Sequence, residues 1–126
     1  YKYTLKIPGS VYIKERKIII RSELVAKEKV CLGGTNEVYM DLDKIQQPVI
    51  IRTRREGDWF QPLGMQGRQK IKEFFIDHKM PQCQRNEIMM FVDQVSVIWI
   101  ENMRLSDRVK ITPETKNVLK LEILDS

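Results

Sequence analysis

The alternation of apolar and polar residues predicts several short β-strands in this chain. The clearest run is β-branched and apolar over residues 17–28, where its second half alternates. Another strand is expected over residues 4–8, ending at the turn signal Pro8-Gly9. Further strand-like runs cover residues 38–42, 49–54, 89–92, 95–100 and 118–124. Asp93-Gln94 has the form of a tight hairpin turn, which favours antiparallel pairing.

One segment has the period of an α-helix instead. Over residues 68–79, side chains recur at the spacing i, i+3, i+4, i+7 and therefore share one face: Ile71, Phe74, Phe75 and His78. Pro81 ends this segment, and a short helical turn is expected over residues 84–88. Mostly antiparallel strands with one main helix packed on them make the expected fold class α+β.

The length of 126 residues corresponds to one domain or two very small ones. Residues 43–48 read as a connector and as the expected boundary. Residues 1–48 are then a β-rich segment, either a lobe of their own or part of the same domain, and 49–126 form the second unit. The chain opens without Met in a strand-like run, so we expect a piece of a longer protein that performs part of its function.

Charge is distributed unevenly along the chain. The net charge is +5 overall, with +4 in residues 52–85, +3 in residues 1–51 and −2 in residues 86–126. The middle segment is therefore the expected partner of a polyanion such as nucleic acid, although a solvated basic face is the plainer alternative. No run reaches the about 18–20 apolar residues of a membrane span, and no signal peptide is visible, so we expect a cytoplasmic protein without a membrane partner.

Basic residues in the middle segment are spaced so that they share faces. Arg52 and Arg54, two apart on an expected strand, point to the same side. On the expected helix, Arg68, Lys72 and Lys79 fall within about 40° of one another beside the aromatic face. This stripe either faces a polyanion or is ordinary amphipathic partitioning.

The loop before the helix is rich in glycine. In Gly64-Met65-Gln66-Gly67, glycine permits close approach of a ligand to the backbone, and nearby cations could complete a phosphate cradle: Arg52, Arg54, Arg68 and Lys70. The loop lacks the Gly-Lys-Ser/Thr ending of a P-loop, and plain turn chemistry is the alternative. A nucleotide loop at Gly33-Gly34 is rejected because nothing helical follows it.

The sequence shows no catalytic constellation. His78 is the single histidine and is expected to be packed or half-exposed, and no Cys/His cluster has metal-ligand spacing. Cys31 and Cys83 are expected to be buried free thiols, although a bridge between them is open. Asp58 either acts as an acid or base or, as we prefer, braces its loop through backbone N–H groups. A binding module without metal or cofactor is therefore expected rather than an enzyme.

The stretch from Arg52 to Pro81 resembles the C-terminal domain of bacterial tRNA(Ile)-lysidine synthetases. That family has the pattern Arg-x-Arg-x-x-Gly-Asp-x-Phe-x-Pro-Leu-Gly-Met-x-Gly, a Lys-rich segment, Phe-Phe-Ile-Asp and Lys-x-Pro. The matching positions begin with Arg52, Arg54, Gly57, Asp58, Phe60, Pro62, Leu63, Gly64, Met65 and Gly67, and continue with Lys70, Lys72, Phe74, Phe75, Ile76, Asp77, Lys79 and Pro81. The later positions that look alike include Arg85, Arg104 and Asp107-Arg108. The likeness is strong over residues 49–121 and vague over residues 1–48.

The resemblance implies a role in lysidine formation, a tRNA modification. The whole enzyme uses ATP with magnesium to activate the wobble cytidine of isoleucine tRNA, and lysine then displaces AMP. That ligase chemistry belongs to an N-terminal catalytic domain with a Ser-Gly-Gly-x-Asp-Ser loop, which residues 32–36 do not reproduce. By analogy, this chain binds no ATP of its own, partners that catalytic domain, and grips the acceptor-stem side of the tRNA.

The resemblance and the charge pattern together single out an RNA-binding set: Arg52, Arg54, Arg55, Phe60, Gly64, Met65, Gly67, Arg68, Lys70, Lys72 and Lys79. The cations would contact phosphates, and Trp59, Phe60 or Met65 could stack on an exposed base, although core packing is the interpretation we prefer for Phe60. The competing hypothesis is a protein-interaction or dimerisation module that braces the catalytic domain. That module would expose an apolar patch and no continuous positive surface.

Overall fold

The computed structural model describes residues 1–31 and 36–125, which form strands and short helices. The strands are β1 (Lys2–Thr4), β2 (Gly9–Ile13), β3 (Ile18–Val25), β4 (Glu37–Asp41), β5 (Ile50–Arg52), β6 (Trp59–Phe60), β7 (Gln69–Lys70), β8 (Met90–Val92), β9 (Val97–Ile100), β10 (Arg104–Leu105) and β11 (Val118–Asp125). The α-helices are α1 (Ile71–Asp77) and α2 (Gln82–Arg85), and 3₁₀ turns cover Lys27–Lys29, Leu42–Lys44 and Asp107–Val109. The expected α+β class is confirmed.

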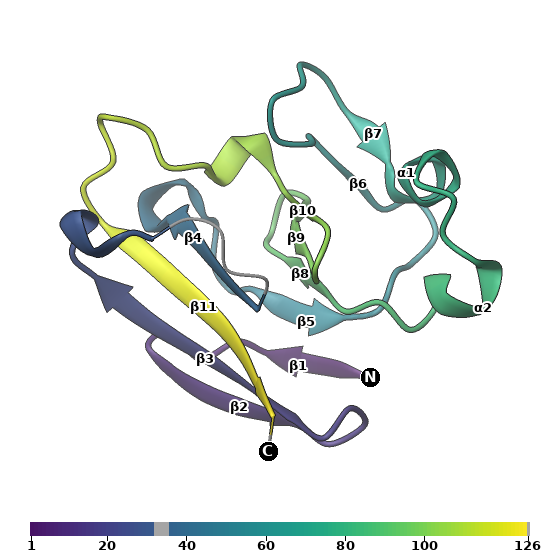
Figure 1. Cartoon of the computed structure of the whole chain (residues 1–126), viewed down its shortest axis with the longest axis horizontal. Coiled ribbons are helices and arrows are strands. Elements are labelled where there is room, and N and C mark those ends of the chain that lie inside the picture. Colours follow the sequence, from purple (N-terminus) through teal and green to yellow (C-terminus); the bar gives the residue numbers. More distant parts are fainter. Residues whose placement is uncertain (32–35, 126) are drawn as a thin grey trace.

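The strands pair into three antiparallel sheets. A five-stranded sheet has the order β1-β5-β8-β9-β10, a four-stranded sheet has the order β2-β3-β11-β4, and β6 pairs with β7. In Figure 1 the five-stranded sheet lies between the four-stranded sheet and the helices. Because β1 and β11 each join strands from across the expected boundary at residues 43–48, both sheets draw on both segments of the chain.

Two apolar clusters hold these layers together. The larger one lies between the two main sheets, and Phe91 of β8 belongs to it. The smaller one lies between the five-stranded sheet and α1, and Met90, the preceding residue of β8, belongs to that one. Successive residues of a strand point to opposite faces, so β8 contributes to both clusters in turn. The middle segment, residues 52–85, is therefore held against the five-stranded sheet by the smaller cluster.

Helix α1 is shorter than the expected helix over residues 68–79. Gln69 and Lys70 are extended and pair with β6, so the helix begins at Ile71, whose N–H donates to the Asp58 carbonyl at 2.9 Å. Lys79 has a φ of +54°, which ends the helical path. The predicted buried face is confirmed at Ile71, Phe74 and Phe75. His78 contacts Phe74 of that face, with ring centroids 4.0 Å apart, but it lies at the C-terminal cap and is exposed rather than packed or half-exposed.

The strand expected over residues 4–8 is wrong in its position. Strand β1 ends at Thr4, and Pro8-Gly9 leads into β2 rather than ending a strand. The Ile7–Pro8 peptide bond is cis, and Gly9 has a φ of +151° that other residues rarely adopt. Local turn signals therefore marked a change of direction between two strands.

Both cysteines differ from the expectation of burial. Cys31 and Cys83 are free, as predicted, but both are exposed. The pair Gly33-Gly34 lies outside the described residues. Among the residues that the structure describes, no helix is long and apolar enough to cross a membrane.

Candidate nucleic-acid interface

The loop between β5 and β6 is organised by a buried ion pair. Arg52 is 8% exposed, and its two terminal nitrogens lie 2.8 and 2.9 Å from the two carboxylate oxygens of Asp58. The same carboxylate accepts the backbone N–H of Arg55 at 2.6 Å. The expected bracing role of Asp58 is therefore confirmed. Arg52, which we expected at the RNA, instead holds the loop from inside, and its charge is neutralised.

In the residues that the structure describes, the other basic residues between 52 and 85 have no carboxylate partner. Within the described part of the chain, ion pairs form at Arg16, Arg21, Lys44, Arg52, Arg108, Lys110 and Lys120. None of them involves the unpaired cations, the name used below for Arg54, Arg55, Arg68, Lys70, Lys72, Lys79 and Arg85. A cation with no internal partner leaves its charge available to an external anion.

Four of the predicted residues gather around one cavity of about 610 Å³, called the basic cavity below. Its walls come from the loop of residues 54–58, from the start of α1 with the residue before it, and from α2 with the residue after it. Five cations line it against the two carboxylates Glu56 and Asp58: Arg54, Arg55, Lys70, Lys72 and Arg85. Since Asp58 is already paired with Arg52, the cavity is strongly positive.

Two guanidinium groups of the basic cavity are held by their Nε atoms. Arg54 donates from Nε to Oδ1 of Asn86 at 3.0 Å, and Arg85 donates from Nε to the Met80 carbonyl at 2.9 Å. Their terminal nitrogens have no hydrogen-bond partner among the described residues. Both forks are thus oriented in advance with their outer donors unused, which suits an anion with several oxygens.

Arg85 was not in the set chosen from the sequence. It matched a late position of the family resemblance, but in the charge pattern it was a single arginine beyond the end of the basic helix. Helix α2 brings it across the cavity from the 54–58 loop. The signal that was available was Pro81, which starts a helical turn with Arg85 in its last position.

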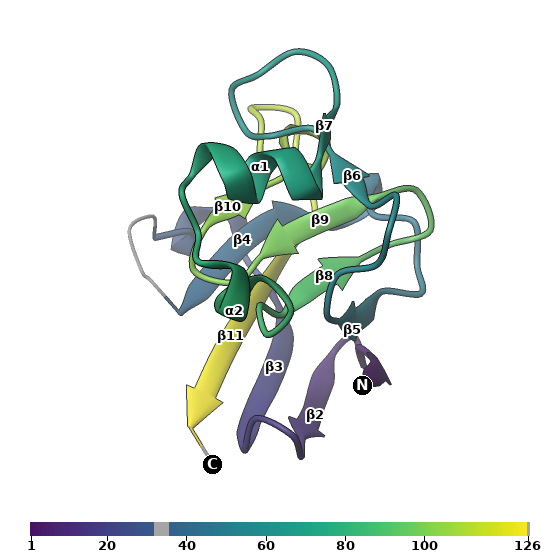
Figure 2. The ribbon, with the colours of Figure 1, turned by 90° about the vertical axis from the view of Figure 1, so that its right-hand side faces the viewer.

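The glycine-rich loop does not join the cavity. Gly64 and Gly67 have φ values of +82° and +88°, so the turn chemistry is real. The Gly64 N–H, however, donates to Oδ1 of Asp107 at 3.1 Å, and this hydrogen bond follows Lys110 among the contacts that lower the pKa of Asp107. In Figure 2 the loop arches above α1, whereas α2 lies below it. The expected phosphate cradle of loop and cations is therefore not assembled as one site.

The aromatic residues of the segment divide into core and surface. Phe60 is fully buried and meets Phe74 edge to face at 5.0 Å, so the expectation that it contacts RNA is replaced by core packing. Trp59 is half-buried, with the Arg68 guanidinium 4.0 Å from its ring centroid. Met65 is 49% exposed on the glycine-rich loop. Trp59 and Arg68, which contact each other, and the exposed Met65 therefore remain accessible to a ligand.

The expected stripe of Arg68, Lys72 and Lys79 along one helix is wrong. Arg68 precedes β7, and Lys79 follows the end of α1, so Lys72 alone is helical. All three side chains are exposed, and of them only Lys72 lines the basic cavity. The basic cavity is thus lined by three segments of the chain rather than by one helix.

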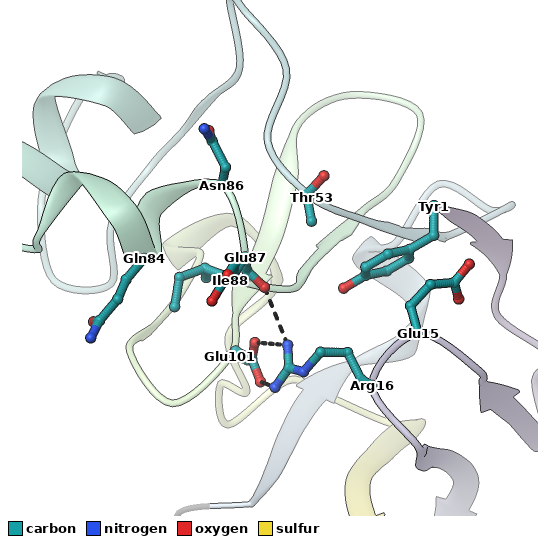
Figure 3. Close-up of a pocket in the computed structure, with 9 residues that line it drawn as sticks. All are labelled: Tyr1, Glu15, Arg16, Thr53, Gln84, Asn86, Glu87, Ile88 and Glu101. Atoms are coloured by element: carbon teal, nitrogen blue, oxygen red, sulfur yellow. Dashed lines mark hydrogen bonds and ion pairs between the residues drawn. The ribbon is translucent and has the colours of Figure 1, made fainter.

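A second cavity, of about 710 Å³, has the opposite character. Figure 3 shows Arg16 directed at Glu101, with two hydrogen bonds of 2.6 and 3.1 Å, and a third bond of 3.2 Å to the Glu87 carbonyl. The hydrogen bond to Glu101 raises the pKa of Arg16. The cavity is lined by three acidic residues, Glu15, Glu87 and Glu101, whereas its arginine, Arg16, is already paired with Glu101. The hydrogen bonds of Arg16 link the turn between β2 and β3 to Glu87 and Glu101. The excess of acidic residues makes this cavity unsuitable for an anion.

Comparisons with known proteins find a family match in the part of the chain that contains the basic cavity. Residues 49–123 match the family model described as "TilS substrate C-terminal domain". The chain is 40% identical over 87% of its length to a tRNA(Ile)-lysidine synthase of Clostridium tetani, and 33% identical over 97% to one of Caldanaerobacter subterraneus. It covers 26% of each, so it spans about a quarter of the length of these curated relatives.

Solved structures support the fold. A structure described as the TilS C-terminal domain superposes with a TM-score of 0.81 and 23% identity, covering 99% of this chain and 96% of the other. An N-terminal fragment of the phenylalanyl-tRNA synthetase β-subunit from Pyrococcus horikoshii reaches a TM-score of 0.57 at 19% identity, with 71% of this chain and 28% of the other covered. At these identities the likeness concerns the arrangement of sheets and helices.

Proposed function

The chain belongs to the family of TilS substrate C-terminal domains, and we propose that it is the tRNA-binding part of a tRNA(Ile)-lysidine synthase. In this proposal it grips isoleucine tRNA on its acceptor-stem side. The whole enzyme works in the cytoplasm, where its N-terminal catalytic domain uses ATP with magnesium to ligate lysine to the wobble cytidine. This chain supplies binding and orientation rather than chemistry.

The observation that carries the proposal is the set of unpaired cations within the matched region. Seven basic side chains lie between residues 54 and 85 without a carboxylate partner in the described structure. Cations that neutralise phosphates release condensed counterions, which supplies much of the affinity of a protein for nucleic acid. A-form RNA hides its base edges in a deep and narrow major groove, so contacts to phosphate and sugar suit a duplex stem.

Groups of three or more His, Cys, Asp or Glu side chains that could hold a metal are absent from residues 1–31 and 36–125. The Nδ1–H of the exposed His78 donates to the Phe74 carbonyl at 2.9 Å, and the His78 ring packs against the Phe74 ring. In this proposal ATP, magnesium and lysine belong to the catalytic domain of the whole enzyme, as the family resemblance implies.

The alternative of a protein-interaction or dimerisation module receives less support. Large apolar side chains that are exposed in the described residues come from β2, β3, the glycine-rich loop, α1 and the turn before β9: Tyr12, Leu24, Leu63, Met65, Ile76 and Val95. They are spread over several elements, whereas an interaction face would be expected to gather them.

A titration tests the proposal directly. The chain is titrated with isoleucine tRNA at about 50 and 200 mM salt, and binding should weaken steeply at the higher concentration because several phosphate contacts are lost together. Arg21→Gln is the matched control, since Arg21 is already paired with Glu122 at 2.7 Å on the four-stranded sheet. Absence of binding, or affinity that does not respond to salt, would contradict the proposal.

A further inference from the structure

We propose that the basic cavity binds the terminal phosphate monoester of an RNA strand, whereas the rest of the unpaired cations contact phosphodiesters along the duplex. This inference rests on the proposed function and assigns a separate task to one part of the surface. Its chemical target is a phosphate with three non-bridging oxygens at the end of a chain.

The shape of the site favours a chain end over a continuous backbone. Cations stand on three segments around the cavity: Arg54 and Arg55 on the loop, Lys70 and Lys72 at the start of α1, and Arg85 on α2. A phosphodiester continues in both directions and stays on the outside of a wide duplex. A terminal phosphate has one attachment and can enter. The volume of about 610 Å³ lies within the range of about 300–1,000 Å³ typical of small-molecule sites.

The donors of the cavity match the oxygens of such a group. The Arg54 and Arg85 guanidinium groups are both fixed by hydrogen bonds from Nε and keep their terminal nitrogens unused within the described structure. Each fork can give two parallel hydrogen bonds to a pair of phosphate oxygens. The two forks come from different segments that line one cavity, and together they offer four terminal nitrogens. A monoester presents three non-bridging oxygens to these donors, whereas a diester presents two.

The charge of the cavity also favours the monoester. A phosphate monoester carries about −1.5 to −2 at pH 7, whereas an internal diester carries −1. Both oxygens of Asp58 are occupied by Arg52, and one of them also accepts the Arg55 N–H, which leaves Glu56 as the carboxylate that opposes an anion. Five cations facing one unsatisfied acid therefore gain more from the second negative charge.

The test compares short RNA duplexes of one sequence that differ at their ends. One carries a 5′ phosphate, one a 3′ phosphate and one hydroxyls throughout, and binding to the chain is measured by fluorescence anisotropy. We expect a duplex with one of the two phosphates to bind about tenfold more tightly than the hydroxyl duplex, since charge-assisted hydrogen bonds contribute on that scale. The arm that shows the gain identifies which end is bound.

Two variants localise the effect. Arg54→Gln with Arg85→Gln should abolish the preference for phosphorylated ends while the hydroxyl duplex still binds. Glu56→Gln should enlarge the preference, because it removes the opposing charge without touching a donor. Thermal unfolding confirms that both variants are folded.

The outcomes separate this inference from the proposed function. Equal affinity for all three duplexes overturns the inference and leaves RNA binding intact. A preference that survives in the double variant also overturns it, because the phosphate is then bound elsewhere. No affinity for any duplex or for isoleucine tRNA contradicts the proposed function itself.

Discussion

The four-stranded sheet and the basic segment treat their charged side chains in opposite ways. Across the sheet face, Arg21 pairs with Glu122 at 2.7 Å, and Lys120 lies 3.4 to 3.8 Å from three acids, forming a charged ladder: Arg21, Glu122, Lys120, Glu23 and Glu37. The hydrogen bond from Arg21 holds the pKa of Glu122 below its usual value. In residues 54–85 the cations have no such partners in the described structure.

We interpret this difference as a division between charges that stabilise the fold and charges that would bind the proposed partner. Acids are present near the basic segment, since Glu73 and Asp77 lie on α1 itself, yet they form no ion pair with a cation in the described residues. Unpaired like charges repel one another and lower the stability of the compact state. A surface that keeps this repulsion, beside a sheet that neutralises its charges, is consistent with an external polyanion.

The largest effect is expected at the buried ion pair of Arg52 and Asp58, which holds the loop between β5 and β6. Asp58→Ala leaves Arg52 buried without a counter-ion and should lower the free energy of unfolding by about 3–5 kcal/mol. RNA affinity should fall with it, because Asp58 also accepts the Arg55 N–H and so shapes the loop that carries the cavity residues. Urea denaturation and tRNA titration measure the two effects.

Glu73→Ala is the control for this variant. Glu73 is exposed on α1, and its removal should change stability by less than about 0.5 kcal/mol. If Asp58→Ala were as mild as Glu73→Ala, Arg52 would be free to face the solvent, and its assignment as an internal brace would be wrong.

The next effect concerns binding alone. Lys70→Gln with Lys72→Gln removes two cavity cations that make no internal ion pair, so stability should change little. The slope of log K against log salt for tRNA should become shallower by nearly 0.9 for each lysine that contacts a phosphate. Arg21→Gln on the charged ladder should leave that slope unchanged. Equal salt slopes for the two variants would contradict the assignment of tRNA binding to the cavity lysines rather than to the charged ladder.

The sequence predicted the elements that depend on local periodicity. Strands β3 and β11 and the buried face of α1 follow from residues a few positions apart, such as Ile71, Phe74 and Phe75. It did not predict the pairing of Trp59-Phe60 with Gln69-Lys70, because a strand of two residues is too short to show an alternating pattern. For that reason the predicted helix began at residue 68, whereas the observed helix begins at Ile71.

The candidate site was predicted in composition but not in assembly. The spacing of Arg52 and Arg54 indicated a shared face. The strand, however, ends at Arg52, and the Arg52 side chain forms an ion pair with Asp58. Which carboxylate a cation meets is a tertiary contact that spacing does not encode. The same holds for Arg85, which reaches the cavity through the path of the chain after α1.

A smaller effect is expected in acid, and it belongs to the paired charges. Burial opposes the ionised form of Asp93, but hydrogen bonds from Arg108 and from backbone N–H groups outweigh it and lower its pKa. A lowered pKa contributes stability that is complete above the unfolded value of about 3.9 and is lost as the pH falls through the folded value. Stability should therefore decline below about pH 4.

Asp93→Asn isolates this contribution. The variant should be less stable than the parent at pH 7, and its unfolding free energy should fall less steeply between about pH 4 and 2. Chemical denaturation at several pH values measures both. RNA affinity at pH 7 should be unchanged, because the Asp93–Arg108 pair lies outside the basic cavity. An acid slope identical to that of the parent would mean that Asp93 does not ionise differently on folding.

The smallest effect is expected from the charged ladder itself. A double-mutant cycle of Arg21→Ala and Glu122→Ala should give only a weak coupling, since Arg21 is largely exposed and solvent screens the pair. The coupling should shrink further in about 1 M salt. A coupling as strong as that of a buried ion pair would show that the ladder is needed to hold the sheet, and the pairing would then reflect a demand of folding. A weak coupling instead means that the sheet does not need this pair in order to fold, so a demand of folding does not account for the contrast with the unpaired cations, whereas the proposed RNA partner does.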